Sequence, residues 1–174
     1  MTIHHDDPFA TPEPDRSPVR RLRGRLVAPV TLWTAPGPPG PPGPAGLTVS
    51  SVLVADGDPG RVLGLVDDES DLWAAVSATG RFALCPLRPG QQRLADRFAG
   101  LAPAPGGLFT QDAWVDTPYG PVPAPAGTWA GCRLDASRRF GWALLVEGTI
   151  ERITLADDRP PLYHHRGRYR TVPQ

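Results

Sequence analysis

Residues 46–55 read GLTVSSVLVA, an apolar and β-branched run with two serines in its middle. Valine, leucine and threonine favour the extended backbone of a strand. The run is bounded by the proline- and glycine-rich residues 36–46 and by Asp-Gly-Asp-Pro-Gly at 56–60, which is typical of a turn. We therefore predict a strand over residues 47–55, followed by a turn into the next strand.

Further short runs of the same composition lie on both sides of this segment. We predict strands over 27–34, 61–66, 81–87, 128–134, 141–155 and 163–172, with a bulge or a bend at Gly148 inside the longest. Helices are predicted over 70–80 and 91–99, because apolar residues recur there at helical spacing, Gly80 ends the first segment and Gly100 follows the second. The pattern indicates a mainly β protein, a β-barrel with short helices, and excludes a doubly wound sheet.

Length and composition set the domain organisation. The chain has 174 residues, and glycine and proline are concentrated at 36–46, 102–107 and 118–127, which we interpret as loops. Residues 1–18 are polar and are predicted to be a disordered tail, and residues 19–174 are predicted to form one domain. Residues 16–25 carry five arginines and favour a short solvated helix, with a phosphate or nucleic-acid contact as the alternative.

The charged residues exclude several classes of function. All 18 basic residues are arginines, balanced by 18 acidic ones, and the chain has neither lysine nor asparagine. A pyridoxal Schiff base and a P-loop both require lysine and are excluded. Zero net charge argues against a nucleic-acid or membrane-surface partner. No apolar segment is long enough to span a membrane, and no signal peptide is visible, so we expect a cytoplasmic protein.

The residues that most often carry catalysis or metal binding form no recognisable motif. Cys85 and Cys132 lie in apolar surroundings and are interpreted as buried free thiols. The four histidines form two neighbouring pairs at opposite ends of the chain, and we predict no metal site. Neither a GxSxG nucleophile motif nor a GxGxxG dinucleotide motif is present, which argues against an α/β-hydrolase and a Rossmann enzyme.

An ordered set of fragments nevertheless matches a known pattern. The fragments are PVTLWT at 29–34, GLTVSS at 46–51, TGRFAL at 79–84, Gln91 with LADRFAG at 94–100, and PLYHHRGRY at 161–169. In this order and spacing, the chain resembles the flavin reductase-like family with the FMN-binding split barrel. The resemblance covers about residues 20–170. It implies a homodimer with FMN between the subunits and hydride transfer from NAD(P)H to the flavin, which then serves a partner oxygenase.

The resemblance also implies a set of cofactor-binding positions. Hydroxyl and backbone groups of Thr48, Val49, Ser50 and Ser51 would bind the polar edge and ribityl chain of the flavin. The remaining positions that we assign to the cofactor are Ser70, Cys85 and Gln91, with FAD or a deazaflavin as alternatives to FMN.

Several family positions are occupied by other residues. The family's serine pair is replaced by Val54 and Asp56, its phosphate-binding threonine by Leu72, its asparagine by Cys85, and the histidine of its Gly-Asp-His motif by Ala143.

Three residues could compensate for these changes. Arg61 could bind phosphate through its guanidinium group, Trp142 could stack on the flavin, and His164 is the candidate proton donor. The alternative is a split barrel that binds flavin, deazaflavin or haem without reductase activity, or that serves only as a structural dimer.

Overall fold

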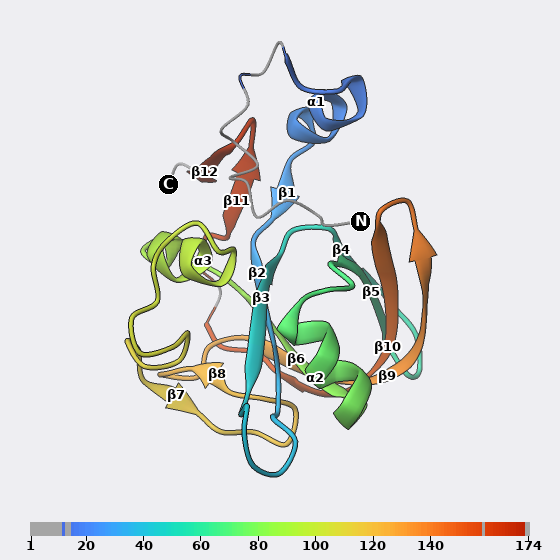
Figure 1. Ribbon diagram of the computed structural model, residues 1–174, viewed down its shortest axis with the longest axis vertical. Coiled ribbons are helices and arrows are strands. Elements are labelled where there is room, and N and C mark those ends of the chain that lie inside the picture. Colours follow the sequence, from blue (N-terminus) through green and yellow to red (C-terminus); the bar gives the residue numbers. More distant parts are fainter. Residues whose placement is uncertain (1–11, 13–14, 158, 173–174) are drawn as a thin grey trace.

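The computed structural model describes residues 12, 15–157 and 159–172, and Figure 1 shows its elements. The helices are α1 (Pro18–Arg25), α2 (Asp71–Thr79) and α3 (Gln92–Phe98). The strands are β1 (Ala28–Pro29), β2 (Thr31–Ala35), β3 (Ala45–Val49), β4 (Val52–Ala55), β5 (Arg61–Val66), β6 (Arg81–Pro86), β7 (Trp114–Val115), β8 (Val122–Pro123), β9 (Trp129–Phe140), β10 (Ala143–Thr154), β11 (Leu162–His165) and β12 (Arg168–Thr171). Most of the predicted tail lies outside the described residues.

A seven-stranded antiparallel sheet in the order β3-β2-β6-β9-β10-β5-β4 forms the body of the molecule. Its two edge strands, β3 and β4, are consecutive in the chain and are separated only by Ser50 and Ser51. The sheet therefore curls so that one edge strand leads directly into the other, and the amide of Leu65 in β5 donates to the carbonyl oxygen of Ser51 at 2.9 Å, which extends the β4–β5 pairing to this connection. The predicted fold class, a mainly β split barrel with short helices, is confirmed.

The single strand predicted over 47–55 is wrong. The chain changes its pairing at Ser50 and Ser51, from β2 on one side to β5 on the other. Composition alone could not show this change, because the residues on both sides have the same strand preference.

The barrel interior is packed around two aromatic rings. Trp33 and Phe82 stack with their ring centroids 4.7 Å apart. Each ring lies against a glycine of a facing strand, because a Cβ built on Gly64 would lie 2.7 Å from the Trp33 ring and one on Gly148 would lie 2.8 Å from Phe82. The register between β9 and β10 shifts at Gly148, which confirms the predicted bulge. Close packing of this kind leaves no room for a side chain at either glycine.

Helix α2 packs beside this interior cluster through the buried residues Leu72, Ala75 and Val76. Its N-cap is Ser70, whose hydroxyl accepts from the amide of Trp73 at 3.2 Å, and its C-cap is Gly80 with φ of 69°. The prediction of a helix between a serine cap and a glycine stop is confirmed.

Helix α3 covers the opposite face of β2 and β6 and builds a second apolar cluster. Leu94 and Phe98 of this helix pack with Leu32 and Cys85 of the sheet. The neighbouring Arg97 is also buried, and its guanidinium group pairs with Asp112 and donates to Gln111 at 2.9 Å. The helix is thereby tied to the long connection that follows it.

A small sheet of β1, β11 and β12 lies beside α1, near both ends of the described chain (Figure 1). The single strand predicted over 163–172 is wrong, because β11 and β12 form a hairpin with Arg166 and Gly167 at φ of 51° and 77°. Positive φ at two successive turn positions usually selects Asn-Gly or Asp-Gly. Arg-Gly therefore gave no recognisable turn signal.

Two other predicted features are confirmed. Residues 36–44 of the loop predicted over 36–46 connect β2 to its partner β3, whereas Ala45 and Gly46 already belong to β3. Residues 18–25 of the arginine-rich segment form the exposed helix α1. None of the helices in the described residues is long and apolar enough to cross a membrane.

Candidate functional site

Three of the sequence fragments meet at one place, where β3 passes α3 and the C-terminal hairpin. The hydroxyl of Thr48 in GLTVSS donates to the carbonyl oxygen of Ala95 in LADRFAG at 2.7 Å. The hydroxyl of Tyr169 in the closing fragment donates to Oδ1 of Asp96 at 2.7 Å. Fragments separated by up to 73 residues in sequence are thus joined directly by side-chain hydrogen bonds.

Helix α1 completes this arrangement from the other side. Nη2 of Arg23 donates to the hydroxyl of Ser51 at 3.2 Å, and the amide of Arg166 donates to the carbonyl oxygen of Gly24 at 2.8 Å. We call the set of Arg23, Thr48, Ser51, Asp96, His164 and Tyr169 the polar corner.

The imidazole of His164 lies edge-on to the ring of Tyr169, with centroids 5.7 Å apart. Its pKa is lowered from the usual 6.5, first by burial, which disfavours the charged form, and then by the positive charge of Arg23. The histidine is therefore held neutral near pH 7. Burial and the hydrogen bond to Asp96 raise the pKa of Tyr169, so its hydroxyl keeps its proton as a donor.

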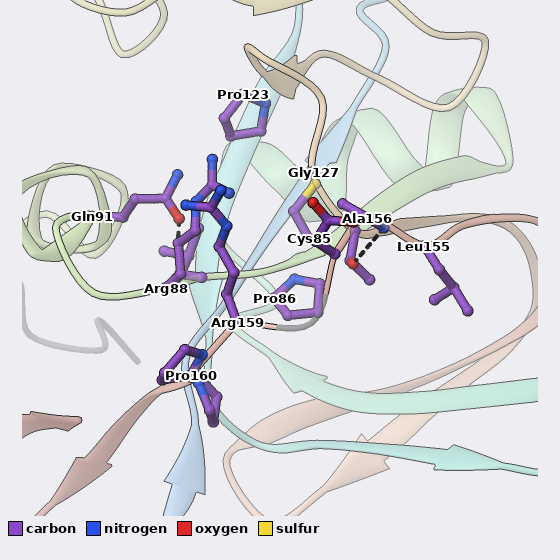
Figure 2. Close-up of a pocket in the computed structure, with 14 residues that line it drawn as sticks. Cys85, Pro86, Arg88, Gln91, Pro123, Gly127, Leu155, Ala156, Arg159 and Pro160 are labelled. Carbon is purple, nitrogen blue, oxygen red and sulfur yellow. Dashed lines mark hydrogen bonds between the residues drawn. The ribbon is translucent and has the colours of Figure 1, made fainter. Parts of the chain in front are cut away.

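A second feature is an open pocket of about 510 Å³ beside the end of β6, drawn in Figure 2. We call it the arginine pocket, because Arg88 and Arg159 line it together with the predicted residues Cys85 and Gln91. Cys85 pairs with Leu32 in β2, which pairs with Thr48 in β3. At the usual strand spacing, this row brings Thr48 and Cys85 to about 10 Å from one another.

The thiols are buried and free, as predicted. Burial raises the pKa of both Cys85 and Cys132 to about 12. Cys132 pairs with Phe82 and packs in the barrel interior, whereas Cys85 packs on the α3 side of the sheet. Because the two side chains point to opposite faces, this fold does not allow a disulfide between them.

Three other predicted residues belong to neither the polar corner nor the arginine pocket. The guanidinium group of Arg61 pairs with Asp135 at 3.1 Å, on the opposite end of the β4–β5 ladder from Ser51. Ser70 uses its hydroxyl to cap α2. Trp142 is 84% exposed at the turn between β9 and β10.

The predicted cofactor-binding segment, residues 48–51, has two kinds of group that could bind a ligand, backbone groups and a side-chain hydroxyl. The side chain of Val49 is buried in the core, so only its backbone could face a ligand. Ser50 is half-buried between β3 and β4, and its hydroxyl has no hydrogen-bond partner within the described part of the chain. Ser50 is therefore the one hydroxyl of the GLTVSS fragment, among the described residues, that is left without an internal bond.

Sequence reasoning assigned no site role to five residues of these sites, which are Arg23, Asp96 and Tyr169 in the polar corner and Arg88 and Arg159 in the pocket. The motif analysis followed the family's fragments, and Arg88 and Arg159 lie just outside the quoted ones. The absence of lysine was the available signal, since every cationic contact in this chain must come from arginine.

The residues present fit a flavin nucleotide in their chemistry. In the arginine pocket, the side-chain amide of Gln91 can form hydrogen bonds, Pro86 and Leu155 offer apolar walls, and Arg88 and Arg159 are cations for a phosphate. Ser50 does not line this pocket, and its hydroxyl is a separate hydrogen-bonding group between β3 and β4. The described residues contain no cluster of three or more histidine, cysteine or acidic side chains that could hold a metal ion.

Comparison with known proteins identifies relatives over almost the whole chain. A family model described as flavin reductase like domain matches residues 23–173. The FMN reductase (NADH) RutF of Methylorubrum extorquens is 28% identical over 164 residues, which cover 92% of this chain and 77% of that protein. The reductase component of 4-hydroxyphenylacetate 3-monooxygenase from Thermus thermophilus is 26% identical over 127 residues, 73% of this chain and 78% of that protein.

Solved structures of flavin reductases have the same fold as this chain. The NADH:FAD oxidoreductase SgcE6 of Streptomyces globisporus superposes with a TM-score of 0.79 at 25% identity, over 94% of this chain and 96% of that chain.

Proposed function

This chain belongs to the flavin reductase-like family, and we propose that it is an NADH-dependent flavin reductase that supplies reduced flavin to a partner monooxygenase. The match of the family model over residues 23–173 carries this proposal. The convergence of three fragments at the polar corner supports it, because the residues that carry the resemblance are neighbours in space.

The bound flavin would accept hydride from the nicotinamide, and the protein would hold the two rings together. Ser50 is the hydroxyl available to bind the flavin, and Thr48 fixes the end of β3 against α3 through its bond to Ala95. His164 is held neutral in the polar corner, so it can donate one hydrogen bond and accept another without adding charge. We propose His164 as the group that positions a proton near the flavin, in place of the histidine that Ala143 replaces.

We propose FMN as the preferred flavin and NADH as the donor, following the relative named FMN reductase (NADH). FAD is the competing flavin, because the similar SgcE6 is named an NADH:FAD oxidoreductase. The expected location is the cytoplasm, where NADH is available.

Anaerobic mixing of the protein with flavin and nicotinamide tests the activity directly. The visible absorbance of oxidised FMN should bleach much faster with protein and NADH than with NADH alone, and NADPH and FAD serve as comparisons. Tight flavin binding without bleaching would contradict the reductase and identify the alternative, a flavin-binding barrel. An absence of flavin binding would exclude both.

We also propose that the protein is a homodimer. The exposed apolar side chains of Val54 on β4 and Ile153 on β10 line a second open pocket of about 540 Å³, and Leu53 of β4 is exposed as well. Exposed apolar surface of this kind is typical of interfaces, and β4 is a sheet edge that a second subunit would cover.

Light scattering tests this proposal. The wild-type protein should have twice the mass of the chain, and the Val54→Asp variant should dissociate, whereas Val19→Asp on the exposed helix α1 should not. A monomeric wild-type protein would contradict the dimer.

A further inference from the structure

The arginine pocket contains two guanidinium groups, those of Arg88 and Arg159, and one described carboxylate, that of Asp157, also lines it. Neither Arg88 nor Arg159 forms an ion pair with a carboxylate of the described residues, although six other such pairs occur there. Asp157 also lines the pocket, but it lies beyond ion-pair distance of both guanidinium groups. Within the described part of the chain, neither guanidinium group is therefore neutralised by a carboxylate in direct contact.

Figure 2 shows the two arginine side chains extending in the same direction, toward Pro123. Arg88 follows β6 and is half-buried, while Arg159 comes from the connection between β10 and β11. Nη1 of Arg88 reaches the loop before β9, since a Cβ built on Gly127 would lie 4.0 Å from it. Two like charges from distant parts of the sequence thus face one cavity, and an anion there would offset their repulsion.

Other residues of the pocket form a rigid wall and restrict the positions of the two arginines. Prolines 86, 123, 160 and 161 form much of its wall, and their fixed backbone angles limit the entropy lost on binding. The amide of Arg88 donates to Oε1 of Gln91 at 3.0 Å, so the side-chain nitrogen of Gln91 remains a donor. The amide of Ala156 donates to the hydroxyl of Thr128 at 3.1 Å, which anchors the segment leading to Arg159.

We propose that Arg88 and Arg159 bind a phosphate group of a nucleotide in the arginine pocket. The guanidinium group is planar and binds phosphate oxygens through two parallel hydrogen bonds, and it stays charged at all physiological pH values. A volume of about 510 Å³ accommodates a nucleotide rather than an inorganic ion alone. The apolar walls reduce the screening of the charges by water.

Two sources of this phosphate are consistent with the pocket, the phosphomonoester of FMN and the diphosphate of an adenine dinucleotide. Titration calorimetry with four probes distinguishes them, namely FMN, riboflavin, ADP and adenosine. Riboflavin and adenosine lack the phosphate and serve as matched ligand controls. The proposal rests on the proposed function only for the FMN arm, because ADP binding requires neither a flavin nor hydride transfer.

Arg88→Gln and Arg159→Gln should each weaken the binding of FMN or ADP about tenfold. They should leave the binding of riboflavin and adenosine unchanged. Arg93→Gln, which removes an exposed arginine of α3 outside the pocket, is the matched control and should change nothing. Asp157→Asn should strengthen binding, because it removes the carboxylate from the pocket. Circular dichroism of each variant shows whether the fold is intact.

A loss confined to FMN identifies the flavin phosphate, and a loss confined to ADP identifies the dinucleotide diphosphate. The proposal is overturned if the wild-type protein binds neither FMN nor ADP, or if folded arginine variants bind both as tightly as the wild type. An arginine-dependent affinity for ADP in a protein that does not reduce flavin would overturn the proposed function and leave this inference standing.

Discussion

The polar corner and the arginine pocket are joined by one row of the sheet, through Thr48, Leu32 and Cys85, yet they satisfy their polar groups in opposite ways. In the polar corner, Asp96 accepts from Tyr169, and Arg23 donates to Ser51. In the arginine pocket, the guanidinium groups of Arg88 and Arg159 have no carboxylate partner among the described residues. Internal pairing indicates a role in fixing the fold, and unpaired charge in a cavity indicates a ligand.

The largest expected effect tests this contrast in the pocket. The double variant Arg88→Gln/Arg159→Gln should lose about 100-fold in affinity for its phosphate ligand if the two contacts are additive. Its melting temperature should match that of the wild type, because neither arginine forms an internal ion pair with a described residue. Calorimetry and thermal unfolding measure the two quantities, and a melting temperature several degrees lower would show that these arginines are structural.

In the polar corner, a substitution should lower stability and leave ligand affinity unchanged. Thr48→Val removes the donor to the carbonyl oxygen of Ala95 and should lower the free energy of unfolding by about 1–3 kcal/mol. That loss corresponds to a fall in melting temperature of roughly 2–4 °C per kcal/mol for a chain of this size. ADP affinity should stay unchanged. Thr48→Ser keeps the hydroxyl and should keep the stability, so an equal loss in both variants would contradict the hydrogen-bond explanation.

The same contrast explains what the sequence could predict. Local signals were sufficient for α2, where Ser70 caps the helix and Gly80 ends it, and for the bulge at Gly148. They were insufficient wherever pairing changes within a uniform run, as at Ser50 and Ser51 between β3 and β4. Strand preference depends on composition, whereas the choice of partner depends on contacts between distant segments.

The same difference separates the two parts of the candidate site: the sequence pointed to the fragments of the polar corner but not to the two arginines of the arginine pocket. The fragments that carry the family resemblance could be identified from their order in the sequence, and they meet in the polar corner. Arg88 and Arg159 could not be paired in advance, since they lie 71 positions apart and each lies in an irregular segment. Arg61 was the predicted phosphate ligand, yet it pairs with Asp135 and Glu147. A charged residue in isolation does not reveal whether a carboxylate will face it.

The thiols give a prediction at alkaline pH. Burial raises the pKa of Cys85 and Cys132 from 9.0 to about 12, so the folded state keeps protons that the unfolded state releases. Stability is therefore full below pH 9 and should fall as the pH rises from about 9 toward 12. Denaturant titrations at a series of pH values measure this slope, and the double variant Cys85→Ala/Cys132→Ala should reduce it. An unchanged slope in that variant would contradict the assignment to the thiols.

The smallest expected effect lies at acid pH in the polar corner. The pKa of His164 is lowered below 6.5 by burial and by Arg23, so the unfolded state binds a proton that the folded state does not. Stability from this group is present above pH 6.5 and should decline as the pH falls below it. His164→Gln should remove that decline, whereas His165→Gln should leave most of it, because His165 makes the smallest contribution to the lowered pKa of His164. If both variants kept the acid dependence of the wild type, the titrating group would lie elsewhere, and His164 would lose its claim to be the neutral hydrogen-bonding group of the polar corner.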